Sequence, residues 1–83
     1  MKIEVLGTGC TKCNQLEANA RAAAQRIGAP FELTHVRDIR EFARRGVIFT
    51  PALAVNGKVI VAGRAASESD IERMLRAAAN DRP

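Results

Sequence analysis

The chain has two cysteines, Cys10 and Cys13, separated by two residues. Thiolates are both nucleophiles and ligands for soft metals, so a pair at this spacing in an intracellular protein is typical of thiol–disulfide exchange or of metal binding. Two cysteines are too few for a disulfide-stapled fold, and a bond between them would close too short a loop to constrain the unfolded chain much. The pair therefore predicts chemistry, in preference to two small buried cysteines that merely pack.

The residues before the pair place it where a strand gives way to a helix. Residues 3–6 have a strand signal that ends at a glycine-rich loop at 7–9. A thiol at the start of a helix faces unpaired backbone N–H groups and the positive end of the helix dipole, and both favour the thiolate. We therefore predict that Cys10 is the nucleophile and that Cys13, one turn later on the core-facing stripe, displaces the mixed disulfide. Lys12 adds a positive charge that either favours the Cys10 thiolate further or is simply solvated.

The rest of the chain alternates helix and strand signals. Apolar residues recur every three and four positions over 13–27, and Gly28 predicts the end of that helix. Asn56-Gly57 between two apolar runs predicts a tight hairpin, so the strands that it joins must be antiparallel. Ser67 with Asp70 is a capping pattern for the last helix. In full, the predicted strands are 3–6, 31–36, 52–55 and 58–61, and the predicted helices are 13–27, 39–45 and 68–79.

This element order, β-α-β-α-β-β-α, predicts an α/β fold. The first three elements form a right-handed parallel crossover, and the hairpin adds two antiparallel strands. The result is one mixed four-stranded sheet with helices on both faces. Eighty-three residues leave room for a single core. We therefore expect one domain at 1–79 and a frayed C-terminal tail at 80–83.

Composition excludes several classes of function. Apolar residues make up 47% and charged residues 27% of the chain, which is ordinary globular composition. Trp and Tyr are absent and Phe occurs three times, so stacking platforms for nucleic acid are not expected. No apolar run approaches the ~18–20 residues of a membrane span, and the N-terminal residues lack the apolar core of a signal peptide. We expect a cytoplasmic monomer that binds neither membranes nor nucleic acid.

The formal net charge of +4 is carried mainly by arginines, with one cluster at Arg37, Arg40, Arg44 and Arg45. The spacing of the first three puts them on one helical face, which could meet an acidic protein or a nucleic acid. Clusters of this size are more often solvated surface, and we favour that interpretation.

Two single residues have both a structural and a functional interpretation. Pro51 leads into a predicted core strand but cannot donate to a sheet, so it is either a simple strand starter or the second residue of a cis peptide. His35 alternates with apolar neighbours near the end of a strand, and we predict a surface residue. One histidine and two cysteines are too few for a zinc site within one chain, so we expect no metal.

The motifs Gly7-Thr8-Gly9-Cys10-x-x-Cys13, Thr50-Pro51 and Gly63-Arg64 together resemble the small thioredoxin-like redox-active disulfide protein family. The resemblance covers nearly the whole chain and implies a thioredoxin- or glutaredoxin-like fold. It also implies that Cys10 and Cys13 cycle between dithiol and disulfide, with no cofactor beyond that redox-active disulfide. In such proteins the residue before a cis-proline offers its backbone to the substrate, a role that falls here on Thr50, with Pro51 completing the catalytic site.

The implied activity is that of a thiol–disulfide oxidoreductase acting on protein disulfides. A thioredoxin-reductase-like enzyme or a low-molecular-weight thiol would reduce it again. Thr50, Thr11 and Lys12 are the candidate substrate contacts. Larger thioredoxins have Trp before the first cysteine and Gly-Pro between the two, whereas this chain has Gly9 and Thr11-Lys12. The reduction potential and the choice of partner therefore do not transfer.

Glu4 has the spacing of the buried acid found in larger thioredoxins. As a proton relay to Cys13 it would need burial and a raised pKa, whereas a partly solvated strand residue needs neither. The alternative function is a soft-metal carrier that holds Cu(I) between Cys10 and Cys13. Small metallochaperones are β-α-β-β-α-β domains, whereas this chain ends β-β-α after Thr50-Pro51, so we favour the redox function.

Overall fold

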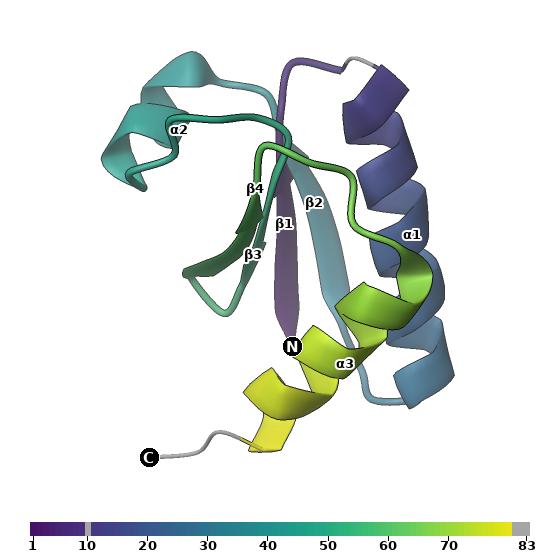
Figure 1. Cartoon of the computed structure of the whole chain (residues 1–83). Helices are drawn as coiled ribbons and strands as arrows, with labels where there is room; N and C mark the ends of the chain where they lie inside the picture. The colour runs from purple at the N-terminus through teal and green to yellow at the C-terminus, as the bar shows by residue number, and fades with distance from the viewer. Residues whose placement is uncertain (10, 81–83) are drawn as a thin grey trace.

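The computed structural model describes residues 1–9 and 11–80, and its elements follow the predicted order (Figure 1). The sequence predicts a frayed tail at 80–83, but helix α3 includes Asn80, and residues 81–83 lie outside the described residues. Within the described ranges, no helix is long and apolar enough to span a bilayer. The elements are β1 (Lys2–Leu6), α1 (Thr11–Ile27), β2 (Glu32–Val36), α2 (Ile39–Arg44), β3 (Ala52–Val55), β4 (Lys58–Ala62) and α3 (Glu68–Asn80).

The four strands form one mixed sheet in the order β2-β1-β3-β4. The β1 and β2 strands are parallel, whereas β3 is antiparallel to both β1 and β4. Helices α1 and α3 lie together over one face of the sheet, and α2 lies on the other side (Figure 1). The predicted α/β class, with a mixed four-stranded sheet and helices on both faces, is confirmed.

Alternation along β1 divides the core in two. Ile3 and Val5 belong to the larger cluster, which α1 and α3 cover. Leu6 belongs to a smaller cluster with Phe42 of α2. Successive side chains of a strand point to opposite faces of the sheet, so the position of a residue in β1 decides which of the two helical layers its side chain faces. Glu4, between Ile3 and Val5, is therefore directed to the side of α2.

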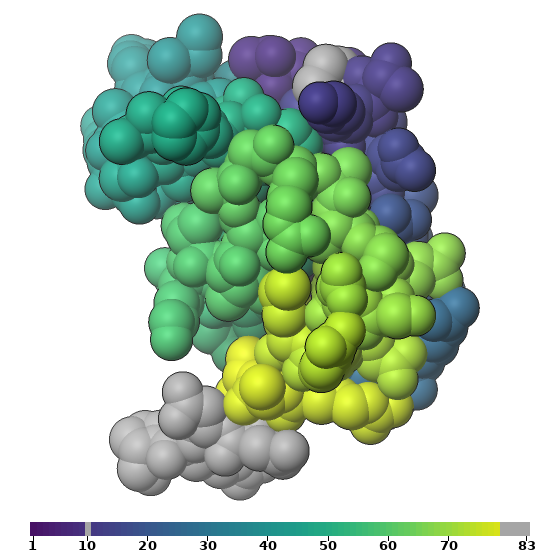
Figure 2. All heavy atoms as spheres, in the orientation of Figure 1, coloured from purple at the N-terminus to yellow at the C-terminus, as the bar shows by residue number. Residues whose placement is uncertain are grey.

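The hairpin between β3 and β4 has the turn that its sequence predicts. Asn56 and Gly57 both have positive φ angles, 52° and 87°, as a type I′ turn requires. The pairing shifts by one residue between Leu53 and Ala54, which leaves β4 with a bulge. The hairpin thereby holds the segment before β3 at the same end of the sheet as the start of α1 (Figure 1). Figure 2 shows the loop after β1, the first turns of α1 and the segment around α2 exposed at that end.

Candidate functional site

Gly7, which follows β1, lies between the buried cysteine and the proline. Its N–H donates to the Val36 carbonyl oxygen at 3.0 Å, so the backbone continues the pairing of β1 with β2. A Cβ atom at Gly7 would overlap Cys13 Sγ and would lie 3.2 Å from Cys13 Cβ and 3.9 Å from Pro51 Cα. Only a residue without a side chain leaves this space to the sulfur. The structure therefore brings Cys13 and Pro51 together around Gly7.

The two cysteines differ in what the structure describes. Cys13 is completely buried on α1, as its helical spacing predicts. Cys10, the predicted nucleophile, lies outside the described residues. Thr11 and Lys12 are exposed in the first turn of α1, and that turn contains no acidic residue. The candidate substrate contacts between the cysteines are thus accessible to solvent.

The segment before β3 joins the site through Pro51. The Thr50–Pro51 peptide is cis, with Pro51 buried and Thr50 exposed. The Pro51 carbonyl oxygen accepts a hydrogen bond from the Gly63 N–H at 2.9 Å, which ties the start of β3 to the end of β4. Immediately before Thr50, the side chains of Ile48 and Phe49 are exposed, by 84% and 67% respectively. An apolar surface therefore adjoins the proline.

Arg37, just after β2, contributes charge to the same loop. Its Nη1 atom lies 2.5 Å from the position that a Cβ at Gly9 would occupy. Gly9 also has a φ of +96°, which L-residues rarely adopt. The sequence places Arg37 only in a basic cluster and gives no signal for this contact. The guanidinium lies beside the residue that precedes Cys10 in the chain.

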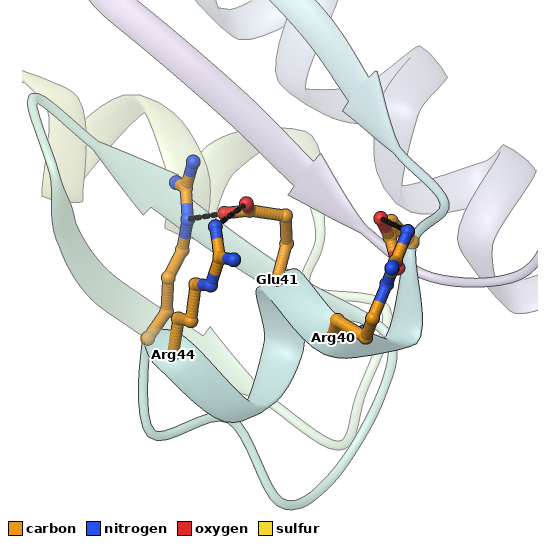
Figure 3. Close-up of polar contacts among 5 residues, drawn as sticks. Arg40, Glu41 and Arg44 are labelled. Carbon is orange, nitrogen blue, oxygen red and sulfur yellow. Dashed lines mark hydrogen bonds and ion pairs between the residues drawn. The ribbon is translucent and has the colours of Figure 1, made fainter.

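The other arginines of that cluster are paired with acids of α2 and its cap (Figure 3). Arg40 lies 3.2 Å from Asp38, and Arg44 lies 2.8 Å from Glu41. Arg45 lies 3.8 Å from the same Glu41 carboxylate. These pairs are mostly exposed, so each contributes little stability, but they neutralise much of the positive charge. The cluster is not one uniform basic face, which agrees with the favoured interpretation of a solvated surface.

Glu4 does not meet the requirement for a proton relay. Its side chain is buried, but on the side of α2, where Arg45 Nη1 donates a hydrogen bond to Glu4 Oε1 at 2.6 Å. That bond lowers the pKa of Glu4 and outweighs the opposing effect of burial. The sequence hypothesis needed a raised pKa, and the alternative of a partly solvated residue is also wrong. Glu4 is a buried, ionised carboxylate paired with Arg45, whose side chain is 26% exposed.

The prediction that His35 is a surface residue is wrong. Its side chain is 9% exposed and lies between α1 and the loop after β1. The ring nitrogens Nδ1 and Nε2 lie 2.6 Å from Glu17 Oε1 and 3.1 Å from the Gly7 carbonyl oxygen. The signal that was available is position: His35 has the same parity in β2 as Leu33, which packs against the larger core cluster. His35 thus contacts the site through Gly7.

Comparison with known proteins identifies the family. The family described as the thioredoxin domain matches residues 1–76 of the chain. The chain belongs to the thioredoxin family. A thioredoxin of Methanothermobacter thermautotrophicus is 37% identical over 75 residues, which cover 90% of this chain and 97% of that protein. A thioredoxin of Methanocaldococcus jannaschii is 34% identical over 74 residues, which cover 89% of this chain and 85% of that protein.

Membership of the thioredoxin family confirms the resemblance drawn from the motifs. The match from residue 1 to residue 76 includes the first six secondary-structure elements and all but the last turn of α3. The family and its relatives indicate a thioredoxin-like thiol–disulfide oxidoreductase. Both relatives are named thioredoxin, and neither gives the soft-metal carrier any support.

Proposed function

We propose that this thioredoxin-family protein reduces disulfides in other proteins through Cys10 and Cys13. The observation that carries the proposal is the arrangement around Gly7, where buried Cys13 and Pro51 meet at the end of β1. A buried thiol near the start of a helix suits a resolving cysteine, and we assign contact with the substrate to the thiol of Cys10, three residues earlier in the chain. Family membership gives the reaction type.

The reaction proceeds in two exchanges. The Cys10 thiolate attacks one sulfur of the substrate disulfide, and the other substrate sulfur leaves as a thiolate. Cys13 then loses its proton and attacks the Cys10 sulfur, forming the Cys10–Cys13 disulfide and releasing the second substrate thiolate. Two electrons pass to the substrate, and both leaving thiolates take up protons. A thioredoxin-reductase-like enzyme or a low-molecular-weight thiol returns the two electrons, and no further cofactor is required.

Local charge supports Cys10 as the first nucleophile. The guanidinium of Arg37 lies against Gly9, and Lys12 is exposed in the first turn of α1. No acidic residue occurs in that turn. Positive charge near a thiol at a helix start favours its thiolate form, and the thiolate is the attacking species.

The surface beside Thr50 supports proteins as the substrates. Ile48 and Phe49 expose apolar side chains directly before Thr50. An extended substrate segment could pair with the Thr50 backbone while its apolar side chains cover these two residues. Thr11 and Lys12 would contact the same segment from α1. We place this activity in the cytoplasm, where the protein acts as a monomer on disulfides that form transiently.

The test is capture of the mixed disulfide together with turnover. Wild-type protein should reduce insulin with dithiothreitol as the electron source. Cys13→Ser should accumulate a mixed disulfide with the insulin chains, because the first exchange occurs and the second cannot. Cys10→Ser is the matched control and should accumulate none. Absence of turnover in the wild type, with tight stoichiometric Cu(I) binding, would contradict the proposal and favour the carrier.

A further inference from the structure

His35 connects helix α1 to the loop that precedes the cysteines. The ring lies 2.6 Å from the Glu17 carboxylate on one side and 3.1 Å from the Gly7 carbonyl oxygen on the other. The ring is 9% exposed and Glu17 is 31% exposed, so solvent screens the contacts with His35 only partly. These contacts span 18 and 28 residues of sequence and join β2, α1 and the loop.

Both partners of the His35 ring are oxygen atoms that accept hydrogen bonds. A carbonyl oxygen and an ionised carboxylate can only accept hydrogen bonds. The ring therefore contacts the Gly7 carbonyl oxygen by donating from Nε2, while Nδ1 faces the Glu17 carboxylate at 2.6 Å. Hydrogen bonds with ionised groups are stronger than neutral ones, so the Glu17 contact holds the ring in place.

Gly7 is consequently fixed from both sides of its backbone. Its N–H donates to the Val36 carbonyl oxygen, and its own carbonyl oxygen accepts from His35. The Gly7 Cα position limits the space available to Cys13 Sγ, because a Cβ there would overlap the sulfur. Any displacement of Gly7 therefore changes the position that the Cys13 sulfur can occupy.

We propose that His35, oriented by Glu17, is a positioning residue for the resolving step. By fixing Gly7 it holds Cys13 Sγ where the sulfur can attack the mixed disulfide. The inference rests on the proposed roles of Cys10 and Cys13. In the step concerned, the Cys13 thiolate forms a bond to Cys10 sulfur and the substrate thiolate leaves. The first exchange, in which Cys10 attacks the substrate, does not involve Cys13 Sγ and is independent of His35.

The two exchanges can be separated with an aromatic disulfide that releases one coloured thiolate in each. In stopped-flow absorbance with one equivalent of this disulfide, the first phase reports attack and the second reports resolution. His35→Leu should slow the second phase about tenfold and leave the first within about twofold, since small misplacement of an intramolecular nucleophile lowers its effective concentration steeply. In His35→Gln the amide can still donate to Gly7, so its second phase should be about three times faster than that of His35→Leu.

Two variants on α1, at Glu17 and Arg21, test the same contact without changing β2. Glu17→Gln removes the charge that orients His35 and should slow the second phase about threefold, and it decides the question if His35→Leu does not fold. Arg21→Gln is the matched control, because Arg21 approaches the other Glu17 oxygen at 3.9 Å from one turn later on α1. It should leave both phases unchanged.

Equal slowing of both phases, or an unchanged second phase in His35→Leu and Glu17→Gln, would overturn the proposal. Lack of a second phase in the wild type would instead contradict the proposed function itself, so the two failures are distinguishable.

Discussion

Replacing Gly7 by alanine tests whether the close contact between this residue, which follows β1, and the buried Cys13 is required. The added methyl group would overlap Cys13 Sγ and approach Cys13 Cβ to 3.2 Å. Gly7 is not among the glycines with positive φ, so the backbone itself tolerates alanine. The whole effect of the substitution therefore comes from the collision with Cys13. Because Cys13 is completely buried on α1, its side chain has no solvent to move into.

The expected magnitude follows from the cost of overpacking. An extra methyl group in a well-packed core costs about 1–3 kcal/mol. A domain of this size has a free energy of unfolding of about 4–12 kcal/mol, so the variant should fold but with a clearly lower midpoint. Each kcal/mol lowers the Tm by about 4–8 °C in a domain of this length. The displaced sulfur should also slow the resolving exchange about tenfold.

Urea unfolding of the reduced protein measures the first effect, and the second phase of the aromatic-disulfide reaction measures the second. Gly28→Ala is the matched control: its φ of +79° strains alanine, with no atom near the added methyl group. The Gly28→Ala variant should lose about 1 kcal/mol of unfolding free energy through backbone strain. Its resolving exchange should be unchanged. A Gly7→Ala variant with wild-type stability and a wild-type second phase would refute this account of the site.

The remaining predictions concern the ion pair and the apolar surface. Glu4→Gln should lower stability at neutral pH by about 2–4 kcal/mol, because Arg45 loses a buried charged partner. The folded-state pKa of Glu4 lies below its ordinary value of 4.5. The loss of unfolding free energy relative to wild type, measured in urea, should therefore be complete above pH 4.5 and should shrink as the pH falls through the folded-state pKa. A loss that does not change with pH would contradict the assignment. Phe49→Ser should raise KM for insulin but not slow reduction of a small disulfide, whereas Ile39→Ser, a comparably exposed position on α2, should change neither. Equal effects on both substrates would exclude Phe49 from docking.

The elements were predictable because their signals are local. Asn56-Gly57 specifies a turn with two positive φ angles, and the structure has both. Periodicity over 13–27 predicted the helix and the burial of Cys13, since the stripe at three- and four-residue spacing must face the core. Boundaries differ by one or two residues, as in α1, which begins at Thr11. Helix ends depend on capping contacts that the pattern of apolar residues does not contain.

The partners of polar side chains were not predictable in the same way. Glu4 pairs with Arg45, 41 residues away, and His35 pairs with Glu17, 18 residues away. Which residues meet depends on strand order and on how the helices lie across the sheet, and no local pattern encodes either. For both residues the sequence supplied only the face of the strand, and the hypothesis about Glu4 failed because Arg45 on that face reverses the sign of its pKa shift.

The alternation along β1 separates the stability of the fold from the chemistry of the site. Glu4 and Arg45 lie on the side of α2, whereas Gly7 contacts Cys13 of α1 and His35 faces Glu17 of the same helix. The sheet thus lies between the Glu4 carboxylate and the Cys13 sulfur, so Glu4 cannot take the Cys13 proton directly. Loss of the ion pair should therefore change acid stability and leave the ratio of the two exchange phases unaltered. Replacement of His35 or Gly7 should change that ratio, because both act on the face that holds the sulfur.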